Sequence, residues 1–109
     1  IYATSRSSML APWSPPVIVD SLVMPGGENA AWLSNDGLEV WFTHAQGADL
    51  NIFRSVRSSR TLAWSAPAPV GALNTALDDE DPHLSPDRRF ILFARRTSAG
   101  PRDIFMATR

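Results

Sequence analysis

The chain has 109 residues, a formal net charge of −1 and a hydrophobic content of 44%. A chain of this length supports one modest hydrophobic core, and its hydrophobic content is too high for an intrinsically disordered protein. The small net charge excludes strong electrostatic attraction to nucleic acid. The absence of cysteine excludes disulfides and thiolate metal sites, and no apolar run approaches the roughly 20 residues of a membrane span.

Strand patterns recur along the chain, whereas proline and glycine interrupt every helical pattern. In chain order, we predict nine strands, at 1–6, 17–22, 30–34, 38–44, 50–57, 69–73, 82–85, 89–95 and 103–108. The connectors 7–16 and 58–68 contain serine and proline and each carries a tryptophan, and 74–83 is predicted as a polar loop. These elements predict an all-β fold.

The sequence repeats itself with a period near 51 residues. Residues 1–6 return at 52–57 and again at 104–109, Trp13-Ser14 returns as Trp64-Ser65, and 33–37 returns at 84–88. A strand-rich unit of about 50 residues is typical of β-propeller blades, which are four-stranded antiparallel sheets. We predict one repeat at about 1–51, a second at about 52–103 and an extra strand at 104–109, which makes about two blades.

Two turns occupy matching positions in the repeats, and we predict that both are structural. The first contains Ser34, Asp36 and Gly37, and the second contains Ser85 and Asp87. Asp-Gly between apolar runs favours a hairpin, because glycine takes positive φ without a Cβ clash. Arg88 stands where the first turn has glycine, so the second turn should be of a different type or strained.

The densest charge cluster is Asp78, Asp79, Glu80 and Asp81. Carboxylate oxygens are the ligands that hard cations prefer, so a cation-binding or partner-binding loop is one interpretation. The spacing is not that of an EF-hand and the turning glycine is absent, which favours a solvated loop.

The two histidines, His44 and His83, suggest no catalytic site. Asp81 and Ser85 flank His83, but alternate residues of a strand share a face by default. Neither histidine has the spacing of a zinc ligand. We therefore predict no enzyme, no cofactor and no metal.

The remaining candidates for a binding site are tryptophan and arginine residues. We predict that Trp32 and Trp41 pack between blades, and that Trp13 and Trp64 are structural because they recur, with a sugar-binding platform as the alternative. The pair Arg95-Arg96 is predicted as a solvated strand end, with an anionic partner as the alternative.

A family resemblance lies in the run 81–87, in the apolar strand after it, in Arg95-Arg96 and in Asp103-Ile104-Phe105. Together these segments resemble the TolB-like (WD-type) propeller repeat. The first copy matches at 33–37, 40–42 and 51–53. The resemblance implies blades of a six-bladed ring, as part of a longer chain or completed by oligomerisation, for example as a homotrimer. The chain starts without methionine and within a repeat, so we expect a processed piece or an excerpt.

Three functions remain open. The resemblance implies a non-catalytic scaffold in the bacterial periplasm or outside the cell, which binds a protein partner such as an envelope lipoprotein. The first alternative is a carbohydrate-binding or glycosidase-type propeller, although Asp36 and Asp87 read as turn residues rather than paired catalytic carboxylates. The second alternative is the propeller portion of a longer peptidase, whose G-x-S-x-G motif this sequence lacks.

Overall fold

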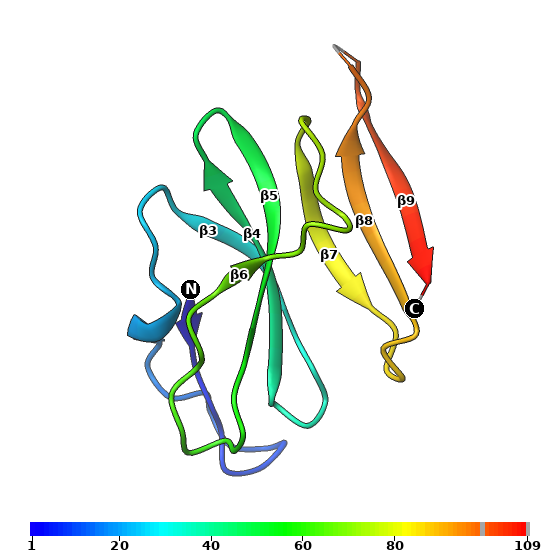
Figure 1. Ribbon diagram of the computed structural model, residues 1–109. Helices are drawn as coiled ribbons and strands as arrows, with labels where there is room; N and C mark the ends of the chain where they lie inside the picture. The colour runs from blue at the N-terminus through cyan, green and yellow to red at the C-terminus, as the bar shows by residue number, and fades with distance from the viewer. Residues whose placement is uncertain (99, 109) are drawn as a thin grey trace.

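The computed structural model describes residues 1–98 and 100–108, and these residues form an all-β protein (Figure 1). The strands are β1 (Tyr2–Ala3), β2 (Val17–Ile18), β3 (Glu28–Leu33), β4 (Glu39–Gln46), β5 (Asp49–Val56), β6 (Ala68–Pro69), β7 (Asp79–Leu84), β8 (Phe90–Arg96) and β9 (Arg102–Thr108), with one 3₁₀ turn, η1 (Asp20–Leu22). Among the described residues, no helix is long and apolar enough to cross a membrane.

The strands form three open antiparallel sheets. Sheet I has the order β1-β2, sheet II has the order β3-β4-β5-β6, and sheet III has the order β7-β8-β9. All neighbours within each sheet are antiparallel, and consecutive strands are joined by hairpins or short connectors. The prediction of an all-β fold of antiparallel sheets is thereby confirmed, whereas the sheets have two, four and three strands and only sheet II has the four predicted for each of two units.

Four of the predicted strand boundaries are wrong. The strand predicted at 1–6 is confined to β1. The strand predicted at 17–22 is confined to β2, because residues 20–22 turn into η1. The strand predicted at 69–73 is β6, which lies at Ala68–Pro69, where Pro67 before the strand and Pro69 within it have no N–H to donate to a ladder. The strand predicted at 82–85 begins instead at Asp79, so the acidic run that we expected in a loop lies in β7.

Sheets II and III share one register. The bulge in β3 lies between Asn29 and Trp32, and the bulge in β7 lies between Glu80 and His83, 51 residues later. Thr43 pairs with Ile52 in sheet II, and Ala94 pairs with Ile104 in sheet III. The period therefore grows to 52 residues in the last strand, because paired residues of β8 and β9 are one residue further apart in the sequence than the equivalent pairs of β4 and β5.

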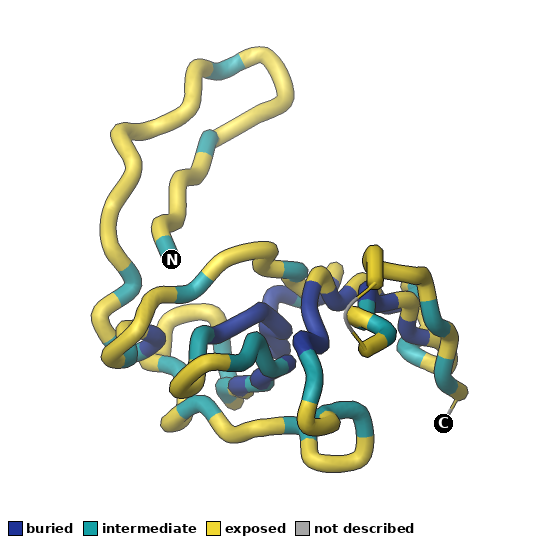
Figure 2. Tube along the Cα trace, turned by 90° about the horizontal axis from the view of Figure 1, so that it is seen from above, coloured by how far each residue is buried: buried dark blue, intermediate teal, exposed yellow. Residues whose placement is uncertain are grey.

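Sheet II lies in the middle of the molecule and carries a hydrophobic core on each face (Figure 2). Its β4 residues Val40, Trp41, Phe42 and Thr43 are all buried, so successive side chains point into opposite cores. The core against sheet III consists of Trp41, Ile52, Leu84, Ile91 and Phe93, and the core toward sheet I consists of Leu22, Val40, Phe42 and Phe53.

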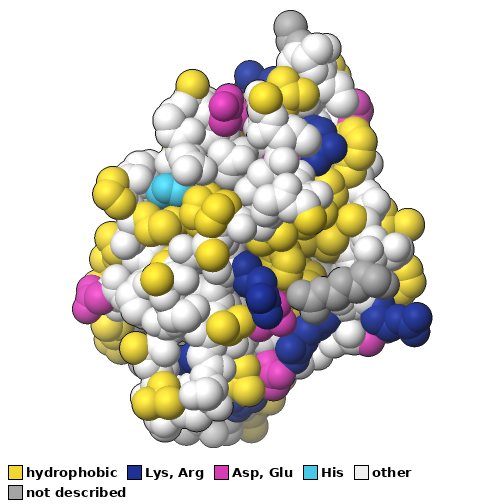
Figure 3. All heavy atoms as spheres, in the orientation of Figure 1, with side chains coloured by type: hydrophobic (Ala, Val, Ile, Leu, Met, Phe, Trp, Pro, Cys, Tyr) yellow, Lys and Arg dark blue, Asp and Glu magenta, His cyan; other side chains and the backbone are white. Residues whose placement is uncertain are grey.

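The outer face of sheet III lacks such a cover. Phe90 and Leu92 alternate with buried residues of β8, Ile104 and Met106 alternate with half-buried residues of β9, and all four are exposed. Hydrophobic side chains are accordingly visible on the surface over and beside these strands (Figure 3). The apolar faces of the described residues are thus paired only where two sheets meet.

We expect Leu84→Ala to lower the free energy of unfolding by about 2–5 kcal/mol, because it leaves a cavity between sheets II and III. The control is Leu10→Ala, since the Leu10 side chain is 98% exposed; its effect should stay within about 0.5 kcal/mol. Urea unfolding of both variants measures the difference. Equal losses would contradict the assignment of this core.

Candidate functional site

The two Ser-x-Asp turns are built from hydrogen bonds within the turn. Ser34 Oγ donates to Asp36 Oδ1 at 2.6 Å, and the same carboxylate oxygen accepts from the Leu38 amide at 3.0 Å. In the second repeat, Ser85 Oγ donates to Asp87 Oδ1 at 2.6 Å. These contacts hold the hairpins β3–β4 and β7–β8 closed, as structural turn residues should. They also occupy the carboxylate oxygens that a glycosidase would keep free for its substrate.

The two turns have one geometry, so of our two alternatives for Arg88, a different turn type or a strained turn, the structure shows the strained turn. Gly37 has φ 71° and Arg88 has φ 59°, and the amide of each donates to the serine carbonyl three residues earlier at 2.8 Å. The left-handed region costs a residue with a Cβ. The Arg88 side chain offsets that cost by contacts with sheet II.

Those contacts form a charged cluster that joins sheets II and III. Arg88 forms ion pairs with Asp36 and with Glu39, the latter at 3.2 Å between Nη1 and Oε2. Glu39 is 3% exposed and also accepts hydrogen bonds from Trp41 Nε1 at 2.9 Å and from Arg54. We call Asp36, Glu39, Arg54 and Arg88 the inter-sheet cluster.

The pKa of both carboxyls in this cluster is lowered. Burial opposes ionisation of Glu39, but hydrogen bonds from Trp41 and Arg54 and the charges of Arg54 and Arg88 outweigh it, so its pKa falls below the ordinary 4.5. The hydrogen bonds from Ser34, from the Leu38 amide and from Arg88 lower the pKa of Asp36 from 3.8 to about 2. Both groups are therefore carboxylates at neutral pH, and neither is prepared to act as a general acid.

The acidic run that we considered as a cation site is bonded to arginines. Asp79 is fully buried, and its Oδ1 lies 2.5 Å from Arg95 Nε. Asp78 pairs with Arg96 at 3.0 Å and with Arg102 at 3.5 Å, and Glu80 also pairs with Arg102. Among the described residues, no group of three or more candidate ligands converges on a common point. Arg95-Arg96 thus pairs within the chain, although Arg96 stays exposed as predicted for a strand end.

Asp81, the last residue of the run, differs from the other three. It is exposed, it has φ 56° in the β7 bulge, and its amide donates to Thr43 Oγ1 at 2.9 Å. Within the part of the chain that the structure describes, no ion pair reaches its carboxylate. The equivalent residue of β3, Ala30, has φ 49°, so the bulge belongs to both repeats.

A groove lies beside Asp81, between the first strands of sheets II and III. Its volume is about 370 Å³, and its walls are Ala30 to Leu33 of β3 and Asp81 to His83 of β7. The Trp32 and His83 rings meet edge to face with centroids 6.5 Å apart. We call this the β3–β7 groove. Sequence reasoning singled out Asp81 and His83 but did not bring them together with Trp32, because only the packing of the sheets does so.

The other histidine lies in a core. His44 is buried, its Nδ1 lies 3.8 Å from Glu28 Oε1, and its ring packs on Phe53 at 5.0 Å. One repeat later, Asp79 and Arg95 hold the same two positions. The buried Glu28–His44 contact in sheet II therefore takes the place that the Asp79–Arg95 ion pair has in sheet III, and we interpret it as structural.

The tryptophans follow the predicted roles where the structure tests them. Trp41 is buried between sheets II and III, and Trp32 packs against the same core. An arginine lies over each repeated connector ring, with Arg6 Cζ 4.4 Å from the Trp13 centroid and Arg57 Cζ 4.2 Å from the Trp64 centroid. Each guanidinium group thus occupies one face of its ring.

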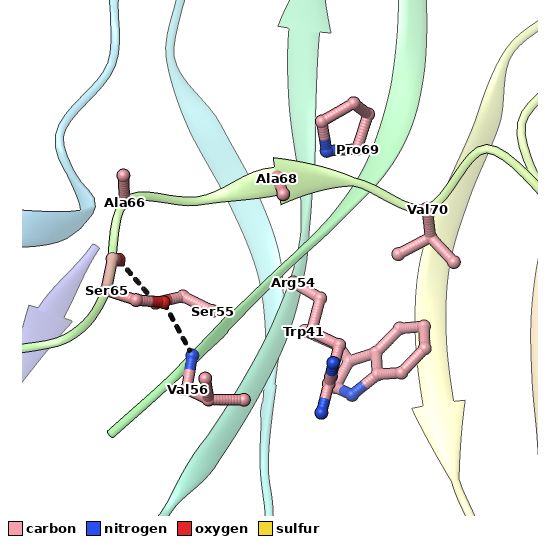
Figure 4. Close-up of a pocket in the computed structure, with 9 residues that line it drawn as sticks. All are labelled: Trp41, Arg54, Ser55, Val56, Ser65, Ala66, Ala68, Pro69 and Val70. Atoms are coloured by element: carbon pink, nitrogen blue, oxygen red, sulfur yellow. Dashed lines mark hydrogen bonds between the residues drawn. The ribbon is translucent and has the colours of Figure 1, made fainter. Parts of the chain in front are cut away.

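A second pocket, of about 310 Å³, lies between β5 and the segment 65–70 (Figure 4). Ser55 Oγ donates to the Ser65 carbonyl at 2.7 Å, and the Val56 amide donates to Ser65 Oγ at 3.2 Å. Thr4 and Ser14 repeat this arrangement in sheet I. These hydroxyl groups thus bind the Trp-Ser connector to the preceding strand. Ser14 and Ser65 recur at matching positions of the repeats, which indicates such a role, but the sequence analysis did not assign it.

Comparisons of the chain with protein-family models, with curated proteins and with solved structures give no match.

We expect acid to weaken the inter-sheet cluster. The pKa of Asp36 is lower in the folded chain than its ordinary 3.8, so its contribution to stability is complete above that value and is lost as the pH falls through about 2. In Asp36→Asn the urea midpoint should depend less on pH between 4 and 2 than in the wild type.

The matched variant is Arg88→Met, which keeps the Asp36 carboxyl and removes one cause of its low pKa. NMR titration of the Asp36 carboxyl carbon should report a higher pKa in that variant. An unchanged titration would contradict the Arg88–Asp36 ion pair.

Proposed function

We propose that this chain is a segment of a TolB-like β-propeller that serves as a non-catalytic scaffold and binds a protein partner in the bacterial cell envelope. Two observations support the propeller: sheets II and III repeat one strand order and one register, and they pack face to face around a shared core. The four-stranded blades of a propeller pack face to face in the same way around its axis, and sheets II and III have four and three strands. The envelope location comes from the sequence resemblance alone.

The observation that best supports a binding function is the β3–β7 groove. The carboxylates of the Ser-x-Asp turns and of Asp78 and Asp79, by contrast, bond to their own turns or to arginines. In the groove, Asp81 and His83 are exposed beside the half-buried Trp32 ring. Exposed aromatic and charged side chains beside a concave surface are the usual anchors of a protein interface.

The backbone around the groove also favours a peptide ligand. β3 and β7 are the first strands of their sheets, so each has one edge that no strand of its sheet covers. The bulges at Ala30 and Asp81 locally interrupt both ladders, which discourages indiscriminate strand addition. A partner segment with an apolar side chain for the Trp32–His83 pair and a basic side chain for Asp81 fits this chemistry.

We expect the double variant Asp81→Asn/His83→Ala to bind its partner at least about tenfold more weakly, because it removes the charge and the aromatic contact of the groove. Immobilised wild-type and variant chains are exposed to a cell-envelope protein extract, and the captured proteins are compared by mass spectrometry. The control is Asp20→Asn, an exposed carboxylate in η1.

A protein captured by the wild type and the control, but lost with the double variant, supports the proposal. Equal capture by all three chains would show that the groove is not the binding surface, and capture of nothing by the wild type would count against a scaffold function.

A further inference from the structure

Two arginines in sheets II and III each pair with a buried carboxylate and also lie over an aromatic ring. The two sets are Glu39–Arg54–Trp41 and Asp79–Arg95–Phe93. The guanidinium carbon lies 5.9 Å from the ring centroid in the first set and 5.1 Å in the second. A guanidinium fits this arrangement, because its N–H groups bond to the carboxylate while its flat face packs on the ring. The chain therefore uses the same combination of three groups twice.

The β3–β7 groove contains two groups of such a set and lacks the third. The exposed Asp81 and the half-buried Trp32 both line the groove, and they come from the first strands of sheets III and II. Among the residues that the structure describes, no ion pair reaches Asp81 and no guanidinium lies over the Trp32 ring. The group that would complete the set is an arginine.

We propose that the protein partner supplies this arginine, whose guanidinium lies between Asp81 and Trp32. The inference rests on the proposed function, because it identifies the chemical group by which the partner enters the β3–β7 groove. It narrows the basic side chain that faces Asp81 to a single residue type, and it gives that side chain an aromatic contact in addition to the charge.

The Asp81 backbone is fixed before the arginine binds. Its amide donates to Thr43 Oγ1 at 2.9 Å, and Thr43 is fully buried. The next residue is the buried Pro82, whose ring fixes its own φ angle. Ordering a flexible main chain costs affinity, so a carboxylate on a backbone that is already held binds a partner more tightly than one on a mobile loop.

The walls of the groove fit the remainder of an arginine side chain. The volume of about 370 Å³ lies within the range of roughly 300–1,000 Å³ that is typical of small-ligand sites. Ala30, Ala31 and Pro82 make part of the lining apolar. Long basic side chains pack their methylene groups on apolar surface and keep the charged head beside water. The stem of the arginine thus lies against these residues, and its head reaches the exposed Asp81.

A lysine fits the same groove less well. Its ammonium is a compact, strongly hydrated charge, whereas the guanidinium is planar, more weakly hydrated and able to stack on an aromatic ring. A lysine in the groove keeps the attraction to Asp81 but loses most of the contact with Trp32. The groove therefore selects arginine over lysine, and it selects both over a neutral side chain of the same shape.

The test uses three blocked pentapeptides, in which arginine, lysine or citrulline is flanked by two alanines on each side. Citrulline has nearly the shape of arginine but no charge. NMR titration of the 109-residue protein follows the Trp32 indole N–H and the Asp81 amide. We expect the arginine peptide to shift both resonances with a Kd in the millimolar range, the lysine peptide to bind at least about threefold more weakly, and the citrulline peptide to give no saturable shift.

Two variants change the charge of the groove in opposite directions. Asp81→Asn removes the carboxylate, and asparagine accepts the left-handed backbone at this position, so the arginine peptide should bind at least about threefold more weakly. Ala30→Asp adds a carboxylate at the equivalent bulge of β3, where φ is 49° and the residue is exposed, so binding should become tighter by a similar factor. Asp20→Asn is the control, and circular dichroism shows that each variant is folded.

Equal binding of the arginine and citrulline peptides, an unchanged affinity in Asp81→Asn, or shifts that spare Trp32 would each overturn this inference. Capture from the cell-envelope extract tests the proposed function separately. Binding of the arginine peptide without any captured protein would support the arginine site and contradict an envelope partner. Capture that depends on the groove, without binding of the arginine peptide, would overturn the arginine site alone.

Discussion

A short sheet with two apolar faces is stable in water only if something packs on each face, and the rest of this structure follows from that constraint. In β4, four successive residues, Val40 to Thr43, are buried, so sheet II cannot leave either side to solvent. Sheet III covers one side, and the segment of sheet I and η1 covers much of the other through Leu22, Ile1 and Val19. The sheets therefore stack in the order of the chain, as they would around a propeller axis.

Within this stack, polar side chains join the sheets rather than face a substrate. Glu39 is nearly fully buried, and its cost of burial is offset by the Trp41 indole and by two arginines, Arg54 from its own sheet II and Arg88 from the β7–β8 turn of sheet III. Arg88 completes this cluster at the expense of a left-handed backbone conformation. A residue under strain persists where the surrounding contacts determine its conformation, and here those contacts join two sheets.

The two repeats also show how one framework accepts different chemistry. The pair Glu28 and His44 in sheet II becomes Asp79 and Arg95 in sheet III, and Gly37 becomes Arg88. The hydrogen bonds that define each strand and turn are kept while the contacts between sheets change. The positions that differ between the repeats and remain exposed, above all Asp81 and His83, can therefore vary without loss of the fold.

The sequence by itself determined the all-β class, the number of strands, the two hairpin turns and the positions of most strands, because these depend on local alternation and on turn residues. It did not determine that Asp78 to Glu80 are buried, since an acidic run reads as solvated until arginines from β8 and β9 are brought beside it. It also could not place Trp32 against His83, which lie 51 residues apart and meet only because sheet III packs on sheet II. Arg88 illustrates the same limit: its backbone preference argued against a glycine-like turn, and tertiary ion pairs with Asp36 and Glu39 outweighed that preference.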